Sequence, residues 1–64
     1  MNWDQVKGNW AQAKGDLKMR WGKLTDDDLA YIDGQRERLQ GKLQEAYGLS
    51  KEEAERQIDQ AYRH

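Results

Sequence analysis

Trp21-Gly22-Lys23-Leu24-Thr25-Asp26-Asp27-Asp28-Leu29 ends one predicted helix and begins the next. Gly22 follows an aromatic residue, and glycine takes the left-handed conformation that closes helices at little cost. The Thr25 hydroxyl can accept a hydrogen bond from a free amide of the following helix, and the three aspartates favour the positive end of that helix. The sequence therefore predicts a helix that stops at Gly22 and another that starts after Thr25.

Upstream of this stretch, apolar residues recur every three or four positions, the spacing that lines one face of a helix. No proline interrupts the chain. The apolar stripe consists of Trp3, Val6, Trp10, Ala13, Leu17, Trp21 and Leu24. We therefore expect one long first helix, with Asn2 and Asn9 as candidate N-caps and Met19 outside its apolar face.

Downstream, a short second helix is predicted, with Leu29, Ile32 and Tyr31 on its apolar side. Asp33-Gly34 then signals either a break or a bend within one longer helix. Leu39, Leu43 and Tyr47 continue the helical spacing up to Gly48.

The end of this helix and the start of the last one carry recognisable signals. Gly48 is a helix stop, and Leu49 can fold back on the last turn as its hydrophobic partner. Ser50 and Glu53 have the spacing of a capping box. The last helix would then bury Ala54, Ile58, Ala61 and Tyr62.

A weak internal repeat supports a division of the chain into two halves. A shift of 26 residues places Gly8, Gly15, Leu17, Trp21 and Gly22 on Gly34, Gly41, Leu43, Tyr47 and Gly48. Each half then reads as a helix, a glycine stop and a capped helix. We predict an all-α fold, a small four-helix bundle of two helical hairpins in one domain over residues 1–64.

Composition excludes several classes of protein. The chain has 64 residues with 36% charged and 36% hydrophobic side chains, a net charge of -1 and no cysteine, and its mean hydropathy is -1.29. Without cysteine there is no disulfide framework and no thiolate nucleophile. No apolar run approaches the roughly 18 residues of a membrane span, and the amino terminus does not resemble a signal peptide. We expect a soluble, monomeric, cytoplasmic protein.

Side chains for catalysis or metal binding are scarce. Thr25 and Ser50 are predicted caps, and His64 is the final residue. Asp26, Asp27, Asp28 and Asp33 lack the spacing of a calcium-binding loop, and dipole capping explains the first three. We expect no enzymatic activity, no catalytic residue, no metal and no cofactor.

Charge is distributed unevenly along the chain. Residues 1–25 carry a net charge of +3 and residues 26–64 a net charge of -4. The favoured interpretation is that the tryptophans pack in the core and the lysines are solvated. The alternative is a partner surface formed by Lys7, Lys14 and Lys18 with any exposed tryptophan, which would bind nucleic acid or an anionic membrane.

The sequence resembles the small bacterial CsbD-like stress-response proteins over residues 2 to about 62. The resemblance rests on Gly8-Asn9-Trp10, Gly15, Trp21 to Leu29, Ile32, Gly34, Leu39, Gly41 and Tyr47-Gly48. It implies a cytoplasmic role in the general stress response, two orthogonally packed hairpins like those of SAM-domain-like bundles, and no known activity, ligand or catalytic residue. Two hypotheses remain, a hydrophilic protectant and a partner-binding module.

Overall fold

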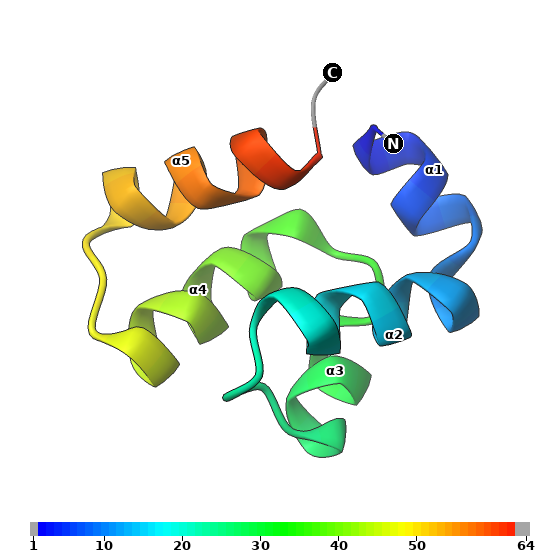
Figure 1. Cartoon of the computed structure of the whole chain (residues 1–64), viewed down its shortest axis with the longest axis horizontal. Coiled ribbons are helices and arrows are strands. Elements are labelled where there is room, and N and C mark those ends of the chain that lie inside the picture. Colours follow the sequence, from blue (N-terminus) through cyan, green and yellow to red (C-terminus); the bar gives the residue numbers. More distant parts are fainter. Residues whose placement is uncertain (1, 63–64) are drawn as a thin grey trace.

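The computed structural model describes residues 2–62, which contain helices and no strand (Figure 1). The helices in chain order are α1 (Trp3–Gly8), α2 (Trp10–Arg20), α3 (Asp26–Ile32), α4 (Arg36–Tyr47) and α5 (Lys51–Ala61). The predicted all-α class is confirmed.

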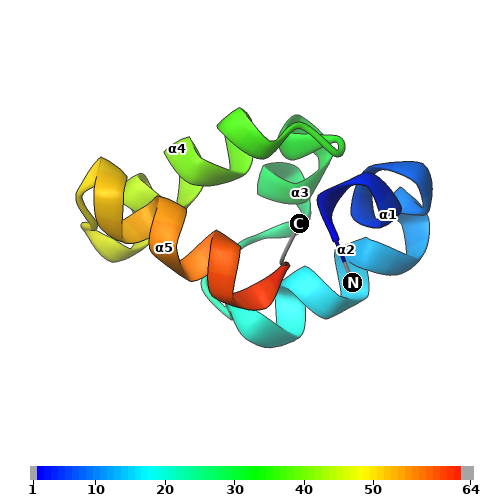
Figure 2. The same ribbon diagram turned by 90° about the horizontal axis from the view of Figure 1, so that it is seen from above.

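The helices pack mainly as neighbours in sequence. The most extensive contacts join α4 to α5, α3 to α4, and α1 to α2. α4 and α5 form the predicted second hairpin (Figure 1). The first predicted hairpin is not confirmed, because the extensive contacts of α3 are with α4, while α2 and α3 are joined by an ion pair between Lys18 and Asp26. The end of α5 returns to the start of α1, as both views show (Figures 1 and 2). The likeness to SAM-domain-like bundles stays a prediction.

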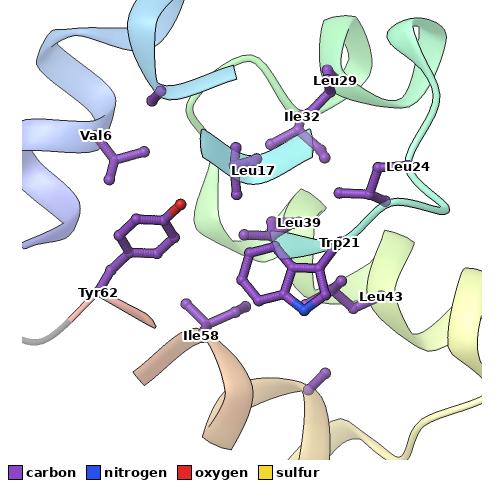
Figure 3. Packing of buried hydrophobic residues seen from close by; sticks show 12 residues of the cluster. Val6, Leu17, Trp21, Leu24, Leu29, Ile32, Leu39, Leu43, Ile58 and Tyr62 are labelled. Atoms are coloured by element: carbon purple, nitrogen blue, oxygen red, sulfur yellow. The ribbon is translucent and has the colours of Figure 1, made fainter. Parts of the chain in front are cut away.

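The core draws on all five helices. Within residues 2–62 its buried members are Val6, Ala13, Leu17, Trp21, Leu24, Leu29, Ile32, Leu39, Leu43, Ala54, Ile58 and Tyr62 (Figure 3). The predicted apolar stripes supply all of them. Trp3, Trp10, Ala46, Tyr47, Leu49 and Ala61 are partly buried and pack around this core. Aromatic rings thus compensate for a small number of aliphatic side chains.

The prediction of four helices with one long first helix was wrong, because the chain bends at Asn9 and makes five helices within the described range. Asn2 caps α1 in a reciprocal capping box with Gln5. Asn9 stands at the start of α2 with a backbone that is neither helical nor extended, and its side chain caps no amide. The bend carries Trp3 and Val6 back over the core, a tertiary contact that periodicity does not encode.

Gly34 breaks the helix and does not merely bend it. Asp33 has φ 45° and Gly34 φ 76°, both left-handed, and the carbonyl of Ile32 accepts the amide of Gln35. A Cβ atom at Gly34 would lie 3.6 Å from the Cα atom of Lys7. The turn therefore needs glycine for its backbone conformation and lies directly against α1.

Two local predictions need correction. Gly22 does not adopt a positive φ, and α2 ends instead with Trp21 as its C-cap, whose amide donates to the carbonyl of Leu17. Tyr31 is 52% exposed and does not join the core, because it sits one residue before the buried Ile32 on the outer side of α3. Met19 is exposed as predicted.

The two predicted hydroxyl caps are present. The Thr25 hydroxyl accepts a hydrogen bond from the amide of Asp28, and the Asp28 carboxylate accepts one from the amide of Thr25. Ser50 accepts from the amide of Glu53 without the reciprocal bond. Gly48, at φ 66°, closes α4. Local sequence thus encoded these three helix ends, unlike the ends at Asn9 and Gly22.

Glycines inside and at the end of helices should respond to substitution in opposite directions. A Cβ atom at Gly15 would meet no atom within 4 Å, so Gly15→Ala should raise the free energy of unfolding by up to about 1 kcal/mol. Gly48→Ala should lower it by about 1 kcal/mol, because Gly48 has a left-handed backbone. Urea unfolding followed by circular dichroism measures both. A destabilised Gly15→Ala variant would show that α2 is not a regular helix at this position.

Candidate functional site

The most elaborate side-chain cluster surrounds Tyr62 at the end of α5. Its ring meets the edge of Trp3 with centroids 5.8 Å apart, and Trp21 lies at 6.3 Å. The ring is only 1% exposed and lies between Val6 and Ile58 (Figure 3). The cluster joins α1, the end of α2 and the end of α5.

Polar contacts complete the Tyr62 cluster. The Tyr62 hydroxyl donates to Oδ2 of Asp16 at 2.6 Å, and Nε of Arg20 donates to the same oxygen at 2.9 Å. The guanidinium of Arg20 also lies 5.4 Å from the centre of the Tyr62 ring. The one polar atom of a buried ring is therefore paired with a carboxylate that is itself charge-balanced.

These contacts shift pKa values away from neutrality. The hydrogen bonds from Tyr62 and then Arg20 lower the pKa of Asp16 below its ordinary value of 3.8. Burial and the bond to Asp16 raise the pKa of Tyr62. Both groups hold their protonation state across neutral pH, so the cluster is suited to fastening helices and not to proton transfer.

Sequence reasoning placed Tyr62 in the core but missed its partners. Asp16 lies 46 residues away in sequence, and Asp16 with Arg20 looked like an ordinary pair one helical turn apart. The sequence signal that could have indicated this contact is the position of Asp16, directly before Leu17 of the apolar stripe.

The three candidate partner lysines do not form one free basic surface. Lys18 donates to Asp26 at 2.8 Å. That bond and its charge, with the more distant charge of Lys14, lower the pKa of Asp26. Lys7 lies apart from them at the end of α1, with its stem against the Gly34 turn. Two of the lysines thus face the acidic start of α3.

Other cations of the surface also have local partners. Arg38 and Lys42 each lie 5.0 Å from the centre of the Tyr31 ring, and Arg38 donates to the Tyr31 carbonyl. Lys42 approaches Asp28 at 3.5 Å. The exposed ring of Tyr31 is therefore flanked by charge instead of lying open as an apolar docking point.

The hollows of the surface are polar and open. One groove between α4 and α5 is lined by Arg36, Glu37, Gln40, Gly41, Gln44, Lys51 and Glu55. Arg36 donates to Asp59, while its Nη1 atom is buried without a hydrogen-bond partner. Acidic, basic and amide groups alternate along this groove, with no preference for one ligand charge.

The residues considered for chemistry have structural positions. The hydroxyls of Thr25 and Ser50 cap helices, and His64 lies outside the described residues. Residues 2–62 hold no group of three or more histidine, cysteine or acidic side chains placed for a metal. Within the same range no helix has both the length and the apolar character needed to cross a membrane.

The profile of a protein family described as CsbD-like matches residues 4–56. The chain belongs to the CsbD-like family. The resemblance carried by Trp21 to Leu29 and the spaced glycines is thereby confirmed. No solved structure matches the chain significantly.

Curated relatives of this CsbD-like protein cover most of its length. UPF0337 protein YjbJ of Escherichia coli O6:H1 is 54% identical over 92% of this chain and 86% of the relative. UPF0337 protein ECA0631 of Pectobacterium atrosepticum is 57% identical over 91% and 84%. UPF0337 protein pc0632 of Protochlamydia amoebophila is 58% identical over 89% and 86%. Their names state no activity.

Removal of the Tyr62 hydroxyl tests how strongly the Tyr62 cluster fastens the fold. Tyr62→Phe should lower the free energy of unfolding at pH 7 by about 1 to 2 kcal/mol, because a hydrogen bond to a charged group is lost. The folded-state pKa of Asp16 is depressed, so its contribution is complete above the unfolded pKa and is lost as pH falls through the folded pKa. The difference in free energy of unfolding between the unchanged protein and Tyr62→Phe should therefore become smaller below pH 3.8.

Tyr47→Phe is the matched control. The Tyr47 hydroxyl accepts a hydrogen bond from the amide of Lys23, a group that does not titrate in this range. The loss of stability in Tyr47→Phe should therefore stay the same over the same pH range. Urea unfolding at several pH values measures both variants. If the loss of unfolding free energy depended on pH in the same way for both variants, Asp16 would not be the group that stabilises the Tyr62 hydroxyl.

Proposed function

We propose that this CsbD-like protein is a non-enzymatic, cytoplasmic protein of the bacterial general stress response that acts as a hydrophilic protectant. The family resemblance supplies the stress role. The proposed activity is the stabilisation of many other macromolecules through weak contacts, with no dedicated binding pocket.

The distribution of apolar side chains is the observation that carries this proposal. Within residues 2–62 the large hydrophobic side chains left exposed are Met19, at 86%, and Tyr31, at 52%. These two side chains do not make an apolar patch of the size that marks protein interfaces. A surface of interspersed charges without such a patch limits association through apolar contacts.

Short-range charge pairing points the same way. Ion pairs join Lys18 to Asp26, Arg20 to Asp16 and Arg56 to Glu53. Cations paired with nearby carboxylates contribute little to the long-range attraction of polyanions, and the net charge is only -1. This surface therefore favours weak, non-saturating contacts with many macromolecules over tight binding of one partner.

The alternative partner-binding module keeps one supporting observation. Trp10 is only partly buried, and Lys14 lies four residues after it in the same helix, α2. A partly exposed indole with a lysine one helical turn away is common on surfaces that bind phosphates.

Protection of a freeze-sensitive enzyme tests the proposal. The purified protein should preserve activity through freezing or drying in proportion to its concentration, and a Lys7→Gln/Lys14→Gln variant should protect equally, because no basic surface is needed. An unrelated helical protein of similar mass serves as the reference. Residual enzyme activity is the measurement.

Titrations separate the two hypotheses. We expect no saturable binding of single-stranded nucleic acid or of anionic vesicles at low salt. Saturable binding that the Lys7→Gln/Lys14→Gln variant loses would overturn the protectant hypothesis in favour of the module. Protection no better than that of the reference protein would also overturn it.

A further inference from the structure

The junction between α1 and α2 is a hinge of one residue. Asn9 alone separates the two helices, with φ -132° and ψ 52°. Its amide still donates to the carbonyl of Gln5, and its carbonyl still accepts the amide of Ala13. Helical hydrogen bonding thus reaches the hinge from both sides.

The hinge is not fastened in its bent form by a cap. The side chain of Asn9 donates to that of Gln12 and bonds no backbone amide at the start of α2. A continuous helix would give those amides carbonyl acceptors from α1. A Cβ atom at Gly8 would meet no atom within 4 Å, so the space beside the hinge is open.

The apolar pattern also fits a continuous helix. Trp3, Val6, Trp10, Ala13 and Leu17 follow one helical stripe across Asn9. Local sequence therefore favours a straight segment, and the bend is held by what α1 contacts elsewhere. Where local and tertiary preferences conflict, a second arrangement of the same segment becomes accessible.

The site that receives α1 is made by distant segments. The indole Nε1 of Trp3 donates to the carbonyl of Gly34 at 3.2 Å, and its ring meets Tyr62. Val6 is fully buried, and the stem of Lys7 packs on the Gly34 turn. None of these contacts requires that α1 belong to the same chain.

We propose that the partner of this site is a second copy of the chain, through exchange of α1 in a domain-swapped dimer. When Asn9 becomes helical, residues 3–20 form one helix about 27 Å long, and α1 leaves its own Gly34 and Tyr62. The α1 of each copy then occupies the site of the other around a two-fold axis, which closes the assembly. Short hinges favour such exchange.

Energetics set the direction of the exchange. The dimer makes the same contacts of Trp3 and Val6 as the monomer and adds helical hydrogen bonds at two hinges, against the entropy lost on association. The monomer therefore dominates in dilute solution, and the dimer grows with protein concentration. Residues that prefer a helix at position 9 increase its share.

Substitutions at Asn9 provide the test. Alanine has a higher helix propensity than asparagine, so Asn9→Ala should raise the dimerisation constant about tenfold, from about threefold at each of two hinges. Asn9→Gly should lower it, since glycine disfavours the straight form. Gly15→Ala is the matched control, because it adds helix propensity within α2 and away from the hinge.

Sedimentation equilibrium from micromolar to millimolar protein measures the constants, and circular dichroism checks that each variant is folded. Isotope-filtered spectra of mixed labelled and unlabelled Asn9→Ala chains should then show contacts between Trp3 of one chain and Tyr62 of the other.

Two results would overturn the exchange. One is a folded Asn9→Ala variant that stays monomeric at millimolar concentration or dimerises no more than the Gly15→Ala protein. The other is a dimer whose contacts between Trp3 and Tyr62 are all within one chain, which would indicate association by another surface.

Discussion

Burial of Tyr62 is the constraint on which the rest of the structure depends. Its ring packs against Trp3 in α1 and Trp21 at the end of α2, and its hydroxyl donates to Asp16. A buried hydroxyl without a partner costs free energy, so the ring can occupy this place only with α2 correctly aligned. One residue thus couples the last helix to the first two, in a chain too short to rely on aliphatic packing alone.

The electrostatics of the surface follow a consistent principle of short-range pairing. The acidic start of α3 suits the helix dipole and also receives Lys18 from α2. Arg38 and Lys42 lie over Tyr31, so the most exposed aromatic ring is flanked by charge. The uneven distribution of charge along the sequence is therefore reduced in space, because oppositely charged segments fold against each other. This pairing is the physical reason for favouring a protectant over a nucleic-acid or membrane-binding module.

The bend at Asn9 shows how tertiary contacts override a strong local pattern. Periodicity across residues 3–20 describes a single helix, and no proline or cap forbids it. The bent form gives up helical hydrogen bonds at the hinge and gains the burial of Val6 and the contacts of Trp3 with Gly34 and Tyr62. In a two-chain assembly, residues 3–20 can keep both the helical hydrogen bonds at the hinge and the tertiary contacts of Trp3 and Val6, because α1 then makes those contacts with the other chain.

The sequence by itself determined the helical class, most core positions and the caps at Thr25, Ser50 and Gly48, because these depend on spacing and on neighbours within one helical turn. The family was likewise readable from Trp21 to Leu29. Only the tertiary structure decided the break at Gly34 against the alternative bend, the hinge at Asn9, the exposure of Tyr31 and the partners of Lys18 and Tyr62. These features depend on contacts between residues far apart in sequence, such as Asp16 with Tyr62, which leave no periodic signal in the chain.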